Sequence, residues 1–116
     1  MTTKILILLG TMFFSVQSFG AGGRGDDSCG KFTNAVREVR NGNWTEWNGY
    51  ADYAYGFVSA TNYWMPEIYN AFGSTDMLGM MGFLEKYCAD NPLDTYFSAL
   101  SESVVELYPN STKTKP

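Results

Sequence analysis

The chain contains two cysteines, Cys29 and Cys88, and its first 20 residues have the layout of an export signal. A positive charge at Lys4 precedes an apolar run of ten residues, and small residues follow that run. We expect cleavage after Gly20. In the oxidising compartment to which such a signal leads, we expect an even pair of cysteines to form a disulfide.

The disulfide would constrain this chain strongly. It would close a loop of 59 residues between Cys29 and Cys88, which corresponds to roughly 4 kcal/mol in the chain-entropy model. Two thiols without any histidine cannot supply the four ligands of a structural zinc site, so we expect no metal and no other cofactor. A membrane-spanning helix needs about 20 apolar residues, so we expect no stable membrane insertion after cleavage.

Charge further limits the partners. The 116 residues include 12 acidic and 8 basic side chains, for a net charge of −4, and loss of Lys4 with the signal lowers it to −5. This balance lacks the basic footprint of nucleic-acid-binding proteins, so we expect no nucleic-acid partner. The 45% of apolar residues is too high for a disordered chain.

Apolar residues recur at helical spacing, with no period-two run between them. We therefore predict an all-α fold of four main helices plus one short helix, stapled by one disulfide, over residues 28–108. A Gly-rich flexible arm (residues 21–27) would precede this domain, and a polar tail (residues 109–116) would follow it. The short helix would lie in residues 66–73, after the stop at Pro66.

Each main helix has its own apolar stripe and end signals. Asp27 or Ser28 would cap the first helix, and Gly42 would end it in the left-handed conformation. The third would follow a cap at Ser74 or Thr75, and the fourth would start at Asn91-Pro92. The predicted stripes are Cys29, Phe32, Val36 and Val39 in the first; Met77, Met81, Leu84 and Cys88 in the third; and Leu93, Phe97, Leu100, Val104 and Leu107 in the fourth.

The second helix, predicted over residues 44–65, has two apolar faces. The faces comprise Trp47, Ala51, Ala54, Val58 and Met65 on one side and Tyr53, Phe57, Ala60 and Trp64 on the other. One interpretation is a core helix covered by the other three. The alternative is that Tyr53, Phe57 and Trp64 form a protein-binding surface, because aromatic side chains dominate interface anchors. The two interpretations are compatible if a homodimer buries this surface and releases it under some condition.

Catalytic chemistry is not indicated. The serines lack a histidine base, there is no Gly-rich phosphate loop, and Glu102 and Glu106 lie on a face expected to be solvated. We therefore expect a non-enzymatic protein without catalytic residues.

Three segments resemble a known family. They are residues 28–32 (SCGKF), 55–60 (YGFVSA) and 87–93 (YCADNPL), the last preceded by Asp76. Together they resemble the HdeA-like group of small secreted bacterial proteins and are also similar to the Tai-type immunity proteins of type VI secretion. The resemblance covers about residues 28–107. It implies an all-helical fold whose disulfide joins the first helix to the helix before the Asn91-Pro92 turn.

The HdeA resemblance implies a periplasmic, stress- or acid-responsive chaperone that is a dimer near neutral pH and binds unfolded clients through apolar surface. Without histidine, an acid response would come from the carboxylates, which lose charge below about pH 5. The Tai resemblance implies instead an immunity or inhibitor protein that neutralises one effector enzyme in the periplasm. A third alternative is a eukaryotic secreted protein, because residues 43–45 and 110–112 fit the glycosylation acceptor pattern.

Overall fold

The computed structural model describes residues 22–65 and 75–107. These residues form a 3-10 turn, η1 (Gly23–Asp26), and four helices: α2 (Cys29–Arg40), α3 (Thr45–Trp64), α4 (Met77–Asp90) and α5 (Tyr96–Leu107). The predicted all-α class with one disulfide is confirmed. The export signal, the short helix after Pro66 and the polar tail lie outside the described residues.

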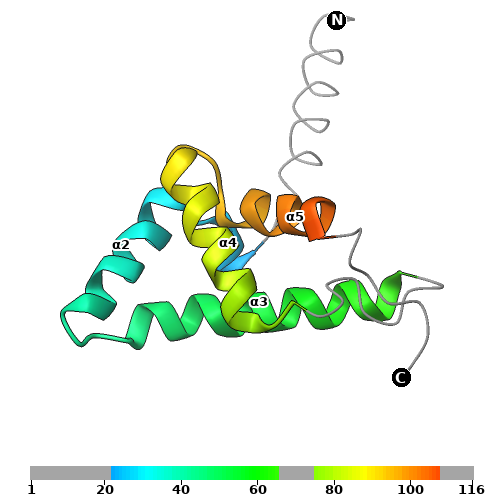
Figure 1. The fold of residues 1–116 in the computed structure, drawn as a ribbon, viewed down its shortest axis with the longest axis horizontal. Helices are drawn as coiled ribbons and strands as arrows, with labels where there is room; N and C mark the ends of the chain where they lie inside the picture. The colour runs from blue at the N-terminus through cyan, green and yellow to red at the C-terminus, as the bar shows by residue number, and fades with distance from the viewer. Residues whose placement is uncertain (1–21, 66–74, 108–116) are drawn as a thin grey trace, which may run out of the picture.

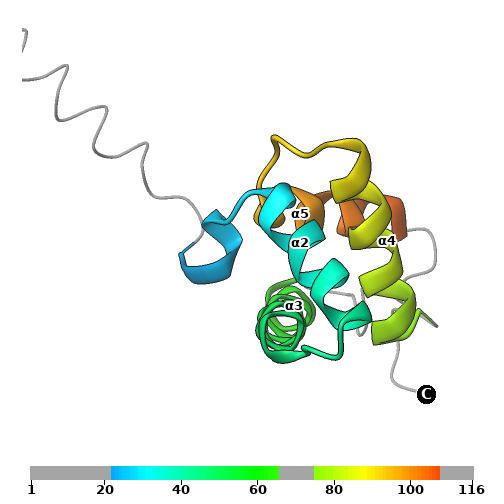
Figure 2. The ribbon, with the colours of Figure 1, turned by 90° about the vertical axis from the view of Figure 1, so that its left-hand side faces the viewer.

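The longest helix, α3, lies along one side of the described fold, and its C-terminal half runs on past α4 (Figure 1). Figure 2 looks nearly along α3 and shows α2, α4 and α5 gathered to one side of it. In this group α4 packs against both α2 and α5, while η1 contacts α5 and α3. The N-terminal half of α3 therefore faces the core, as its buried residues Tyr50, Ala51 and Ala54 show.

Local sequence signals account for the start and end of α2. The Ser28 hydroxyl accepts a hydrogen bond from the Lys31 backbone N–H and so caps the helix. After Asn41 the chain turns at Gly42, whose φ of +82° lies in the left-handed region that suits glycine. Ser28 and Gly42 thus occupy their predicted positions. The cap of α4 differs from the prediction, because Asp76 accepts the bond from the Gly79 N–H.

The core contains a contact cluster of three buried aromatic rings from three helices. The Phe32 ring centroid lies 5.2 Å from that of Tyr50 and 4.8 Å from that of Tyr96, and the two tyrosine rings are 4.9 Å apart. Aliphatic, sulfur and alanine side chains complete the core: Cys29, Ala35, Ala51, Ala54, Met80, Met81, Leu84, Cys88, Ala99 and Leu100. Most of the predicted stripe of α4 is therefore correct, with Met80 added.

The disulfide between Cys29 and Cys88 joins the first turn of α2 to the last turn of α4. The loop that follows α4 consequently runs across the start of α2. There the Cys29 N–H donates to the Asp94 carbonyl at 2.6 Å and the Gly30 N–H donates to the Pro92 carbonyl at 3.2 Å. These bonds satisfy helix-terminal N–H groups that have no partner within α2.

This use of the loop makes the prediction for the fourth helix wrong at its start. Helix α5 begins at Tyr96, not after Asn91, and the Thr95 hydroxyl accepts the capping bond from the Ser98 N–H. Leu93 therefore lies before the helix and is 96% exposed, and Phe97 is 39% exposed. The rest of the predicted stripe is correct, because Leu100 is buried and Val104 and Leu107 pack against the core. The face of α5 that packs into the core comprises Tyr96, Ala99, Leu100 and Ser103.

Residues 23–27 were expected to be part of a flexible arm, whereas the structure gives them defined contacts. They form η1 and its exit, with Gly25 buried. The Asp27 carbonyl accepts a hydrogen bond from the Tyr96 N–H at 2.8 Å, and Arg24 pairs with Glu46. The charged residues of the segment reach partners on α2 and α3, which its Gly-rich composition does not reveal.

Candidate functional site

A groove between α3 and α4 is the candidate binding site, which we call the α3–α4 groove. It consists of two hollows of 430 and 240 Å³, which meet at Tyr55 and Met77 because both residues line each hollow. The larger hollow is lined from α3 by Trp47, Asn48, Ala51, Asp52 and Tyr55, and from α4 by Met77, Leu78 and Met81. The smaller one continues toward Val58, Ser59 and Asn62 on α3 and toward Thr75, Asp76 and Met80 beside α4.

Helical spacing explains why these α3 residues share a wall. Trp47, Ala51, Tyr55, Val58 and Asn62 follow one another at intervals of four, four, three and four residues, which places them on one side of a helix. Between Trp47 and Asn62 the helix rises by about 22 Å. The groove is therefore an elongated feature about four helical turns long.

Large apolar side chains remain exposed along the α3–α4 groove. Leu78 is 74% exposed and Tyr55 is 54% exposed. At one end Trp44 is half exposed, and its ring meets that of Trp47 edge to face at 5.4 Å. The opposite wall is provided by methionines, whose flexible thioether side chains adapt to different shapes. This combination of rigid aromatic rings and adaptable methionines is typical of surfaces that bind apolar segments of proteins.

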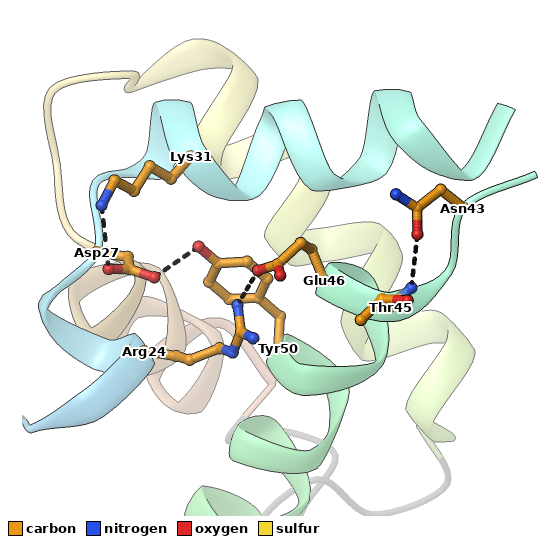
Figure 3. A network of polar contacts seen from close by, with 7 residues as sticks. All are labelled: Arg24, Asp27, Lys31, Asn43, Thr45, Glu46 and Tyr50. Carbon is orange, nitrogen blue, oxygen red and sulfur yellow. Dashed lines mark hydrogen bonds and ion pairs between the residues drawn. The ribbon is translucent and has the colours of Figure 1, made fainter. Parts of the chain in front are cut away.

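A network of polar contacts lies on the side of α3 away from the groove, where η1 meets α2 and α3 (Figure 3). We call Arg24, Asp27, Lys31, Glu46 and Tyr50 the η1 clip. Arg24 donates to the Glu46 carboxylate at 2.7 Å, and its guanidinium lies 4.7 Å from the Tyr50 ring centroid. The Tyr50 hydroxyl donates to Asp27 at 2.7 Å, and the Lys31 ammonium lies 3.7 Å from the same carboxylate.

The η1 clip raises the pKa values of Tyr50 and Arg24. Burial raises the pKa of Tyr50 to about 12, and the hydrogen bond to the Asp27 carboxylate adds to this effect. The hydrogen bond to Glu46 raises the pKa of Arg24 above its usual value. The clip therefore holds a neutral tyrosine between charged groups, and its two carboxylates fasten η1 to α2 and α3.

The aromatic surface predicted on α3 does not form one patch. The Tyr53 ring is half buried, with its centroid 6.1 Å from that of Tyr96, and the Phe57 ring packs against Phe97 at 5.9 Å. Trp64 lies near the end of α3, 76% exposed, with its ring against Tyr63. The other predicted face, from Trp47 to Met65, packs on the core. A binding role for Tyr53, Phe57 and Trp64 stays a prediction.

Three other features of the described residues bear on function: metal-ligand groups, membrane-spanning helices and exposed carboxylates. In residues 22–65 and 75–107, no three His, Cys, Asp or Glu side chains are grouped so that they could hold a metal ion. Within the same ranges, every helix is too short or too polar to cross a bilayer. Glu102 and Glu106 are exposed and line a hollow of 390 Å³ with Lys86 and Asp90.

Sequence reasoning placed several lining residues of the α3–α4 groove on apolar stripes but missed its two most exposed apolar ones. Tyr55 and Leu78 belong to none of the predicted stripes, and an apolar side chain outside the stripe of an amphipathic helix is a signal of exposed apolar surface. Arg24 gave no comparable signal, because its partners Glu46 and Tyr50 are more than 20 residues away.

Comparison of the chain with known protein families, with curated proteins and with solved structures finds no match.

Proposed function

We propose that this chain is a non-catalytic binding protein of the periplasm or another extracytoplasmic compartment, with a chaperone role of the HdeA-like type. It would hold apolar segments of unfolded polypeptides. The observation that carries the proposal is the α3–α4 groove, where Tyr55 and Leu78 remain exposed beside the methionines of α4. Exposed apolar surface of this kind marks sites that bind other proteins.

The covalent link between α2 and α4 supports the proposed compartment. Disulfides persist in oxidising environments and are rare in the cytosol. The bond between Cys29 and Cys88 therefore suits an exported protein, in keeping with the signal expected over residues 1–20.

Three carboxylates hold contacts that join separate parts of the fold. Asp27 accepts the Tyr50 hydroxyl, Glu46 pairs with Arg24, and Asp94 accepts the Tyr87 hydroxyl at 2.6 Å. Each carboxylate takes part in a charge-assisted hydrogen bond. In the proposed chaperone, loss of these contacts would expose further aromatic surface of α3 for clients.

The defined shape of the α3–α4 groove also favours the second candidate, an immunity or inhibitor protein that binds one folded effector enzyme near neutral pH. An elongated concave site with fixed aromatic walls can recognise one partner as well as many. A homodimer that covers the groove at neutral pH is compatible with both functions.

The test is suppression of client aggregation by the purified chain at pH 7 and pH 3. The chaperone proposal expects suppression that weakens when Leu78→Ser removes an exposed groove side chain. Val105→Ser is the matched control, because Val105 is also exposed, at 69%, but lies on α5 outside the groove. Suppression that is absent at both pH values, or that both variants reduce equally, overturns the proposal.

A pull-down at pH 7 and pH 3, with mass-spectrometric identification, separates the two candidates. The chaperone would retain many proteins at low pH. The immunity protein would retain one stoichiometric enzyme at neutral pH, and that result would replace the first proposal by the second.

A further inference from the structure

The α3–α4 groove has a charge as well as a shape. Its lining side chains include two carboxylates, Asp52 and Asp76, and no lysine or arginine. Both carboxylates are exposed. The Asp76 side chain is held in place because one of its oxygens accepts the N–H of Gly79 at 2.7 Å.

The basic residues of the described ranges lie elsewhere. Arg24 belongs to the η1 clip, and Lys31, Arg37 and Arg40 lie on α2. Lys86, although on α4, lines the separate hollow beside Glu102 and Glu106. No described cation therefore neutralises Asp52 and Asp76 within the groove, and a partner could supply the opposite charge.

The aromatic walls favour the same partner. Trp47 and Tyr55 line the larger hollow together with Asp52. Lysine and arginine are attracted to the faces of tryptophan and tyrosine rings, and they lay their aliphatic stems on apolar surface. A groove that joins such rings to carboxylates suits a side chain with an apolar stem and a cationic head.

We propose that the α3–α4 groove binds a cationic amphipathic helical segment of a partner polypeptide. The apolar face of the segment lies on Tyr55, Leu78 and the methionines, and its lysines or arginines face Asp52 and Asp76. The length of the groove, about four helical turns, accommodates a segment of about 15 residues. This inference rests on the proposed function and names the class of segment that the groove selects near neutral pH.

The experiment uses two labelled helical peptides of about 18 residues with identical leucine positions, one with lysines and the other with glutamates on the polar face. Fluorescence anisotropy with the full exported chain measures both affinities near neutral pH at low ionic strength. We expect the lysine peptide to bind about threefold to tenfold more tightly, and we expect added salt to reduce this difference.

The decisive variant is Asp52→Asn with Asp76→Asn. Asparagine caps helices as well as aspartate does, so α4 keeps its cap. The matched control is Asp90→Asn with Glu106→Gln, which removes the same charge from exposed positions outside the groove. The preference for the lysine peptide should fall toward unity in the first variant and persist in the second, with both circular dichroism spectra unchanged.

The outcomes separate this inference from the proposed function. Equal binding of the two peptides, or an equal loss of preference in both variants, overturns the inference while aggregation suppression that depends on Leu78 still supports the proposed function. Failure of both peptides to bind, together with dimerisation that Leu78→Ser abolishes, overturns the inference in favour of a second copy of the chain in the groove. If Leu78→Ser leaves the suppression of client aggregation unchanged, both the proposed function and this inference lose their basis.

Discussion

The Tyr96 hydroxyl donates a hydrogen bond of 3.0 Å to the backbone carbonyl of Tyr50, although the two residues lie 46 positions apart. The Tyr96 side chain is fully buried, and this bond satisfies its polar atom while the ring packs on Phe32 and Tyr50. The bond joins α5 to α3 through the middle of the core. It therefore aligns the helix that carries one wall of the α3–α4 groove.

Replacement of Tyr96 by phenylalanine tests this bond. Tyr96→Phe removes only the hydroxyl, and we expect a loss of about 1 kcal/mol in the free energy of unfolding. Tyr96→Ala also removes the ring and should cost about 3–5 kcal/mol. Urea denaturation measures both. The control is Tyr55→Phe, which changes an exposed side chain and should leave stability within about 0.5 kcal/mol; an equal effect at both positions would contradict the role given to Tyr96.

Alkaline pH should destabilise the protein through three tyrosines whose pKa is raised in the folded state. The hydrogen bond to Asp94 raises the pKa of Tyr87 to about 12, burial raises the pKa of Tyr50 to about 12, and burial raises the pKa of Tyr96 further. A raised pKa means that the folded state favours the protonated form. The resulting stability is therefore complete below pH 10, the value of an unperturbed tyrosine, and is lost as the pH rises through 12.

Absorbance of tyrosinate near 295 nm, followed together with circular dichroism, measures this effect. Tyr50, Tyr87 and Tyr96 should ionise only above pH 10, the value of an unperturbed tyrosine, together with loss of helical signal. A single step near pH 10 with the fold intact would show that these hydroxyls are not held as described.

Removal of the disulfide should destabilise the fold strongly. Cys29→Ala with Cys88→Ala opens a loop of 59 residues, and we expect a loss of roughly 4 kcal/mol in the chain-entropy model. Urea denaturation of the oxidised protein, the reduced protein and the double variant measures the effect. The reduced protein and the double variant should agree closely, and unchanged stability in both would mean that packing alone orders the start of α2.

Three of the four main helices could be predicted from periodicity because their core stripes are local. Cys29 and Phe32 in α2, and Met81, Leu84 and Cys88 in α4, are buried as their spacing indicates. The start of α5 could not be predicted in this way. Asn91-Pro92 is a strong local start signal, but the N–H groups at the start of α2 donate hydrogen bonds to the Pro92 and Asp94 carbonyls. A tertiary contact thus overrode a local preference.

The α3–α4 groove was less accessible to sequence reasoning for a related reason. Tyr55 and Leu78 lie on different helices. The distance between them is set by the packing of the whole core, which positions α3 relative to α4. Their positions outside the apolar stripes could have indicated exposure, but the spacing within one helix carries no information on the other. The charge of the groove follows from the same arrangement, because it combines Asp52 of α3 with Asp76 at the start of α4.

Two glycines of α3 provide a test of the η1 clip within one helix. A Cβ atom at Gly49 would lie less than 3.0 Å from the Arg24 guanidinium, whereas a Cβ atom at Gly56 would meet nothing within 4 Å. Gly56→Ala should therefore stabilise the protein by about 0.5–1 kcal/mol, the usual gain of alanine over glycine in a helix. Gly49→Ala should give less, because it displaces Arg24 from Glu46 and from the Tyr50 ring.

The Arg24→Ala background shows whether this difference comes from the clip. Without the guanidinium, Gly49→Ala meets no obstacle, so it should stabilise the protein as much as Gly56→Ala does. Urea denaturation of the single and double variants gives the coupling between Gly49 and Arg24 as a double-mutant cycle. Equal gains at both glycines in the unmodified chain, or an equally small gain at Gly49 when Arg24 is absent, would mean that Arg24 does not lie against α3. The pair of Arg24 and Glu46 is partly exposed, so we expect a coupling free energy below about 1 kcal/mol. Its sign should be unfavourable, because the methyl group introduced by Gly49→Ala would contact the Arg24 guanidinium.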